Sequence, residues 1–140
     1  MATPETIHRQ YIEAWNRRDF AAMRNLMHPQ YTYTGGDGEE LTGGPDAGLN
    51  IAKMYAAAFP DGRIEIRATY VQGNTAVSEF RATGTHQGEL MGIPPTGKRV
   101  NLVICNVMDV RDGKIYRERE YFDTSTILAR LGVLTSPLQA

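Results

Sequence analysis

The sequence predicts an α+β fold in which a strongly curved antiparallel sheet wraps around N-terminal helices to form a cone with a central pocket. Helical periodicity dominates residues 4–59, whereas alternation of apolar and polar residues dominates residues 63–122. Helices and strands that segregate along the chain in this way are typical of α+β folds. The later strands run for roughly 10 residues each, and long strands in one sheet curl, so that helices packed over them leave a conical pocket.

The first residues predict a helix that begins after Thr3. Thr3 is a suitable N-cap, and Pro4 suits the first helical position. Apolar residues then recur at helical spacing: Ile7, Tyr11, Ala14 and Trp15. Tyr11 and Trp15 therefore point inward, either as core side chains or as walls of a ligand site.

Two more helices and one strand complete the first half of the chain. The second helix is predicted to end near His28, and residues 31–34 alternate as a short strand. A third helix is predicted over residues 45–59, where Pro60 and the residues after it stop it. Tyr33 in the strand and Tyr55 in the third helix are interpreted as either core or pocket wall.

The second half predicts four strands and a short terminal helix. The strands cover residues 63–70, 75–85, 100–110 and 115–122, and the helix covers residues 126–131. Tight turns at Gly73-Asn74 and at residues 111–114 connect neighbouring strands as hairpins. Residues 84–99, rich in glycine and proline, form a loop that is a natural lip for a pocket.

Composition limits the classes of function. A chain of 140 residues suggests one domain over residues 1–140, and a net charge of −1 without a basic cluster predicts no nucleic-acid or membrane partner. No apolar run approaches about 18 residues, so a cytoplasmic protein is expected. Cys105 is the single cysteine, which excludes an internal disulfide and a cysteine-based zinc site. The histidines are scattered, with His8 and His28 interpreted as surface or cap residues, so no metal site is predicted.

Two stretches resemble a known family. Residues 84–100 read GTHQGELMGIPPTGKRV, and residues 112–115 read DGKI before a strand that reaches Asp123 and a turn that ends in Arg130-Leu131-Gly132. Both resemble the SnoaL-like polyketide cyclases of the nuclear-transport-factor-2-like superfamily, and the likeness covers nearly the whole chain. The resemblance implies a pocket for a hydrophobic small molecule and an intramolecular aldol ring closure that uses no metal or cofactor.

The resemblance also implies catalytic residues. A carboxylate near the end of the last strand acts as general acid/base in these cyclases, and Asp123 matches that position; the alternative is that Asp123 caps the last helix. His86 is a second catalytic candidate, or else it pins the loop by hydrogen bonds to the backbone. The cyclases also carry a histidine on the penultimate strand, but residues 100–111 contain none. Asn106 on that strand can hold a substrate carbonyl but cannot move a proton.

Side-chain parity on the last strand defines two alternative pocket faces. Arg119 and Tyr121 share the parity of Asp123, whereas Glu118 and Glu120 point to the other face. If the face of Asp123 is the pocket, Arg119 and Tyr121 line it, and the arginine lowers the pKa of the neighbouring aspartate.

Three functions follow from these observations. The first is a cofactor-independent acid/base enzyme, of cyclase or isomerase type, that acts on a hydrophobic carbonyl compound. The second is an epoxide hydrolase-like enzyme in which Arg119 and Asp123 position a water. The third is a non-catalytic, dimeric small-molecule-binding module. A homodimer through the sheet is expected because residues 100–110 carry enough apolar side chains to cover both sheet faces.

Overall fold

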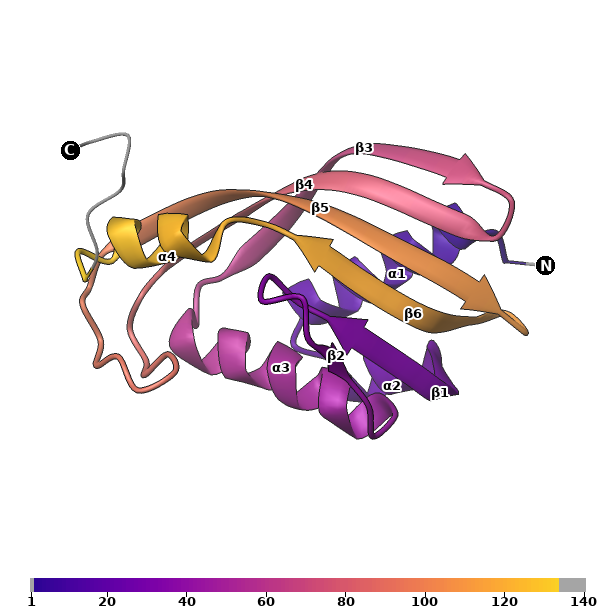
Figure 1. Cartoon of the computed structure of the whole chain (residues 1–140), viewed down its shortest axis with the longest axis horizontal. Helices are drawn as coiled ribbons and strands as arrows, with labels where there is room; N and C mark the ends of the chain where they lie inside the picture. The colour runs from indigo at the N-terminus through magenta and orange to yellow at the C-terminus, as the bar shows by residue number, and fades with distance from the viewer. Residues whose placement is uncertain (1, 134–140) are drawn as a thin grey trace.

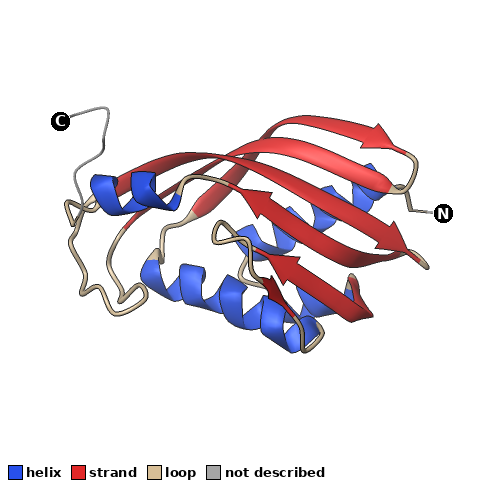
Figure 2. Cartoon of the chain, viewed as in Figure 1, coloured by secondary structure: helices blue, strands red, loops and turns tan. Residues whose placement is uncertain are grey.

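A curved sheet arches over three helices (Figure 1). The computed structural model describes residues 2–133, in which α1 (Pro4–Asn16), α2 (Phe20–Asn25) and α3 (Pro45–Ala58) lie on the concave side of the sheet. A short helix, α4 (Thr124–Arg130), follows the last strand. Figure 2 shows the separation of helices from strands, which confirms the predicted α+β cone.

The sheet has six strands in the order β2-β1-β6-β5-β4-β3. They are β1 (Met27–Thr34), β2 (Glu40–Leu41), β3 (Arg63–Gln72), β4 (Thr75–Thr85), β5 (Arg99–Arg111) and β6 (Lys114–Tyr121). All neighbouring strands are antiparallel except β1 and β6, which are parallel. Register shifts in the β3–β4 and β5–β6 pairs add curvature, because a bulge bends the strand that carries it.

The strand β1 begins earlier than the sequence predicts. His28 lies within β1, not at the end of a helix, because Met27 pairs with Ile115 and the Ile115 amide donates to the Leu26 carbonyl at 2.8 Å. Pairing with a strand almost ninety positions later is a tertiary effect that local propensity does not reveal. The two residues of β2 were likewise not predicted, and α4 begins two residues before the predicted start.

Two apolar clusters fill the space between sheet and helices. The larger joins α1 and α2 to the inner face of the sheet and includes Ile7, Phe80 and Met108. The smaller lies beneath α4 and includes Phe59 and Ile127. Each large side chain buried in this way stabilises the fold by about 1.5–3 kcal/mol.

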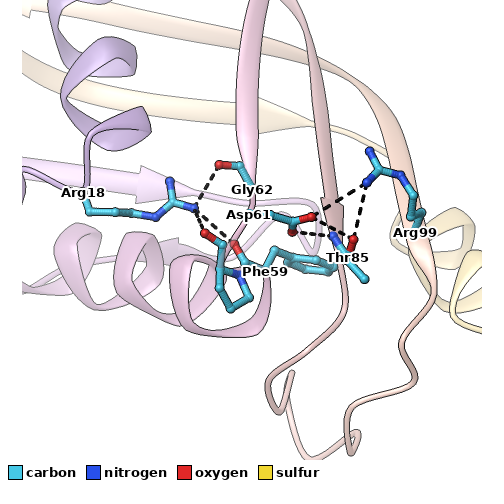
Figure 3. Close-up of polar contacts among 7 residues, drawn as sticks. Arg18, Phe59, Asp61, Gly62, Thr85 and Arg99 are labelled. Carbon is cyan, nitrogen blue, oxygen red and sulfur yellow. Dashed lines mark hydrogen bonds and ion pairs between the residues drawn. The ribbon is translucent and has the colours of Figure 1, made fainter.

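A polar clamp fixes the junction between α3 and β3 (Figure 3). The Arg18 guanidinium donates to three carbonyl oxygens within residues 59–62, at 2.9–3.2 Å. The Asp61 carboxylate accepts from the Thr85 amide at 2.7 Å and from its hydroxyl at 2.8 Å, and Arg99 lies 3.8 Å away. Asp61 therefore ties the start of β3 to the end of β4.

Within residues 2–133, no helix is long and apolar enough to cross a bilayer. The same residues contain no cluster of three or more histidine, cysteine, aspartate or glutamate side chains suited to a metal ion. The predicted single domain extends over residues 1–140, and its outermost residues, 1 and 134–140, lie outside the described part.

Candidate active site

A cavity of about 120 Å³, partly open to solvent, lies between the helices and the inner face of the sheet. Its wall is mostly apolar and draws on both core clusters. The residues that line it include Tyr11, Trp15, Tyr33, Gly48, Tyr55, Phe59, Glu118 and Glu120. Such a cavity, with few polar groups in an apolar wall, is typical of small-molecule sites.

Glu118 and Glu120 point from β6 into this cavity because of a β-bulge. Next to the hairpin turn, Val110 pairs with Ile115. If that register continued, Arg119 would lie opposite Asn106, but one extra residue in β6 places Glu120 there instead. Residues that face each other across a strand pair share a side of the sheet, and a one-residue slip turns every side chain over. The bulge therefore selects the glutamates, not the arginines, for the interior.

Glu118 is only 5% exposed and is held by neutral donors. The Tyr11 hydroxyl donates to its Oε1 at 3.2 Å, and the Tyr31 hydroxyl donates to the same oxygen. Tyr11 comes from α1 and Tyr31 from β1, so the carboxylate joins a helix to two strands.

The Asn106 side chain bridges the two carboxylates. Its Nδ2 donates to Glu118 Oε2 at 2.9 Å and to Glu120 Oε2 at 3.2 Å. The Tyr33 hydroxyl donates to the other oxygen of Glu120 at 2.8 Å. A single amide nitrogen thus holds both carboxylates side by side, and Glu120, less buried than Glu118, presents its edge to the cavity.

This environment favours protonation of the pair. Burial, followed by the charge of Glu120, raises the pKa of Glu118 to about 7, against the hydrogen bonds from Tyr31, Asn106 and Tyr11. Burial also raises the pKa of Glu120. Among residues 2–133, no lysine or arginine forms an ion pair with either carboxylate. Two buried acids without a counter-charge cannot both ionise easily, which is a common arrangement in acid/base sites.

A second buried polar contact lies behind Asn106. His8 is 1% exposed and bonds through Nε2 to the Ser78 hydroxyl, and Ser78 lies opposite Asn106 in the β4–β5 pair. Burial lowers the pKa of His8, which favours the neutral imidazole. The interpretation of His8 as a surface or cap residue is therefore wrong.

The structure places four of the predicted binding residues in the cavity wall: Tyr11, Trp15, Tyr33 and Tyr55. Trp15 also donates from Nε1 to the Ala52 carbonyl at 3.1 Å, which fixes α1 against α3. Asn106 is fully buried behind the wall and bonds to the carboxylates, so it orients the acids and has no free amide N–H directed at a ligand.

The predicted position of Asp123 in the pocket is wrong. Its side chain is exposed and caps α4, accepting from the Ser125 amide at 2.9 Å. Arg119 and Tyr121 share its parity, as predicted, but that parity faces outward: Arg119 pairs with Asp109 at 2.8 Å, and Tyr121 is 59% exposed. Arg119 and Asp123 therefore lie outside the wall of this cavity, where an epoxide-opening pair would have to be.

His86 also lies outside the cavity wall. It is fully buried in the loop, where its Nδ1 accepts from the Thr96 amide at 3.2 Å and its ring packs against Phe59 at 5.6 Å between centroids. Its backbone carbonyl accepts from Gly97 at 2.8 Å. This is the geometry of the alternative interpretation, in which His86 pins the loop, and it replaces the catalytic role expected for His86.

Sequence reasoning missed Glu118 and Glu120 as site residues. Both parities of β6 carry charged residues, so composition alone does not separate the inner face from the outer one. The useful signal was Asn106, which shares its parity with the apolar residues Ile104 and Met108. That parity marks the inner face of β5, but only the bulge shows which β6 residue it meets.

The curved, unclosed sheet over helices places this chain in the class of small cone-shaped α+β proteins, here with two carboxylates in the wall of an apolar cavity. The family of SnoaL-like polyketide cyclases matches residues 5–131, and the chain belongs to this family.

Relatives within and around the family extend the comparison. Aklanonic acid methyl ester cyclase AcmA of Streptomyces galilaeus is 24% identical over 125 residues, which cover 89% of this chain and 87% of that protein. The crystal structure of IdmH, a candidate polyketide cyclase from Streptomyces antibioticus, has a TM-score of 0.80 and 28% identity, covering 94% of this chain and all of that one. AclR, a candidate hydroxylase from Streptomyces galilaeus, has a TM-score of 0.84 and 25% identity, covering 95% of this chain and 83% of that one.

Proposed function

We propose that this protein is an acid/base enzyme that closes a ring within a hydrophobic, polyketide-like carbonyl compound, with Glu120 as the general base. The observation that carries the proposal is a pair of carboxylates in the wall of a mostly apolar cavity, held by neutral donors alone. Membership of the cyclase family and the activity named for AcmA support the same reaction class.

The reaction needs one proton to be moved twice. Glu120 removes a proton from the carbon next to a substrate carbonyl, and the resulting enolate attacks a second carbonyl in the same molecule. The new carbon–carbon bond leaves an alkoxide, which takes the proton back from Glu120, so that no atom is gained or lost. A carboxylate with a raised pKa suits both steps, because it is a stronger base when ionised and still a usable acid when protonated.

The second carboxylate, Glu118, explains how acid/base catalysis can proceed without a histidine on β5. We assign one shared proton to the pair near neutral pH, held mainly by the more buried Glu118. Asn106, with a hydrogen on each acid, keeps them adjacent. In this arrangement Glu118 is a positioning residue that keeps Glu120 from facing a second full charge.

The test is turnover of Glu120→Gln on a panel of aromatic polyketide methyl esters that includes aklanonic acid methyl ester, followed by mass spectrometry. Removing a general base should lower kcat by about 100-fold or more. Asp123→Asn is the matched control, because the same carboxylate-to-amide change on the exposed cap should alter turnover by less than about twofold. The product should have the mass of the substrate, since an aldol closure is an isomerisation.

Other outcomes select other functions. A product heavier by one oxygen would indicate hydroxylation, as the likeness to AclR would suggest. Binding of the panel without any turnover by the wild type would favour a non-catalytic module. Full activity in Glu120→Gln would remove this residue from the mechanism.

A further inference from the structure

Four tyrosines surround the carboxylate pair, and three of their hydroxyls are already engaged. Tyr11 and Tyr31 donate to Glu118, and Tyr33 donates to Glu120. Tyr55 lines the same cavity, yet its hydroxyl makes no hydrogen bond with any residue in the described range 2–133. Among these four, Tyr55 alone therefore has an O–H that a bound molecule can use.

The helix α3 places Tyr55 in the cavity wall. Its ring packs against both apolar clusters. Ala52, one turn earlier on the helix, and Phe59, the C-cap residue of the helix, also line the cavity. Burial, followed by the charge of Glu120, raises the pKa of Tyr55 to about 12, so that the hydroxyl stays protonated and acts as a donor near neutral pH.

The rest of the wall offers few competing donors. Asn106 uses its Nδ2 on both carboxylates. Arg63 and Thr83 lie opposite each other in the β3–β4 pair, near the start of β3, and Arg63 is exposed to solvent. The best placed hydrogen-bond donor for an enolate that forms beside Glu120 is therefore on α3, across the cavity.

We propose that the Tyr55 hydroxyl donates a hydrogen bond to the substrate carbonyl oxygen whose neighbouring carbon Glu120 deprotonates, and that it stabilises the enolate oxygen as charge develops there. This inference rests on the proposed function. It places the reacting ketone between α3 and β6, with the remainder of the substrate along the apolar wall at Val100, Leu102 and Phe122. A donor fixed in advance at a developing oxyanion accelerates a reaction by about 100- to 1,000-fold in comparable sites.

The first experiment compares Tyr55→Phe with the wild type in steady-state kinetics. Because the hydroxyl has no hydrogen-bond partner among residues 2–133, the variant should fold with unchanged melting temperature, and kcat should fall about 100-fold with little change in KM. The pH dependence of kcat/KM should keep its position, because Tyr55 makes no hydrogen bond to Glu120. Tyr70→Phe is the matched control: Tyr70 is 60% exposed on β3, so its kcat should match that of the wild type.

A second experiment measures the proposed hydrogen bond from Tyr55 by ligand binding, without turnover. In a Glu120→Gln background, where the amide stands in for a protonated base, 2-hydroxy-1,4-naphthoquinone serves as an enolate-like anion and 1,4-naphthoquinone as its neutral parent. Adding Tyr55→Phe should weaken binding of the anion by about tenfold and of the parent by much less, because hydrogen bonds to charged acceptors are the stronger ones.

The outcomes separate this inference from the proposed function. If Glu120→Gln abolishes turnover but Tyr55→Phe stays within about threefold of wild-type kcat, the Tyr55 assignment is overturned and the function stands. If Glu120→Gln keeps full activity, the function fails, and equal weakening of anion and parent by Tyr55→Phe would then reject the donor role as well.

Discussion

The ionisation of Glu118 links the site to the stability of the fold. Its pKa is about 7 in the folded protein, above the ordinary value of 4.5. Between these values the folded state binds more protons than the unfolded state, so stability falls as pH rises through this window. Wild-type protein should therefore have a lower free energy of unfolding at about pH 8 than at about pH 5, measured by urea titration.

Two variants test whether Glu118 causes this pH dependence of the free energy of unfolding. Glu118→Gln removes the titration, so its free energy of unfolding should fall less between the same two pH values. Glu79→Gln, on the exposed face of β4, should keep the wild-type dependence. Equal pH dependence in Glu118→Gln and the wild type would show that this carboxyl does not carry a raised pKa in the folded state.

At the scale of elements, the contact between α3 and β1 depends on one glycine. A Cβ built on Gly48 would lie 2.3 Å from Cε1 of the Tyr31 ring, so only glycine lets the helix approach the tyrosine that holds Glu118. Gly48→Ala should lower stability by about 1–3 kcal/mol through overpacking, although alanine is the better helix former by about 1 kcal/mol. Displacing Tyr31 should also lower kcat, because Glu118 loses a hydrogen bond.

Thermal unfolding and kinetics of two α3 variants check this prediction. Asn50→Ala raises helix propensity on the exposed side of α3 and should leave both melting temperature and kcat at wild-type values or above. If Gly48→Ala is as stable and active as Asn50→Ala, the close approach of α3 to Tyr31 is not needed for the site.

The elements themselves were largely predictable, because most of their signals are local. Thr3 caps the helix that it was expected to cap, and the predicted turn at Gly73-Asn74 joins β3 to β4. The start of β1 was not predictable, since its pairing with β6 spans most of the chain. The positions of the carboxylates in the cavity were not predictable either, because they depend on the bulge in β6 that turns Glu118 and Glu120 inward, and the sequence does not reveal this bulge.

Asp123 shows why the likeness to a family located the site only approximately. The resemblance predicts a carboxylate at the end of the last strand, and the structure places two carboxylates of that strand, Glu118 and Glu120, in the cavity wall. However, Asp123 is followed by Thr124 and Ser125, and the end of a strand is also where the next helix needs an N-cap. Asp123 therefore serves as the N-cap of α4, and the carboxylates in the cavity wall are Glu120 and Glu118, three and five positions earlier.

At the scale of the whole molecule, the sheet separates the face that borders the cavity from an outer face on which several apolar side chains are exposed. Val103 is 60% exposed and Tyr121 is 59% exposed on the outer side, with Cys105 and Val107 partly exposed beside them. Neighbouring exposed apolar side chains on a sheet are typical of a protein interface. We propose that a second copy of this chain covers this face, which would leave both cavities facing away from the interface.

Size-exclusion chromatography with light scattering tests the dimer. Wild-type protein at micromolar concentration should have about twice the chain mass of 15.6 kDa. Val103→Arg should give the monomer mass, because an arginine from each copy would be buried without a partner at the centre of the interface. Met91→Arg, at an exposed loop position outside this face, should remain dimeric. Since Val103 points away from the cavity, the monomeric variant should retain its kcat, and a wild-type mass of 15.6 kDa would reject the dimer outright.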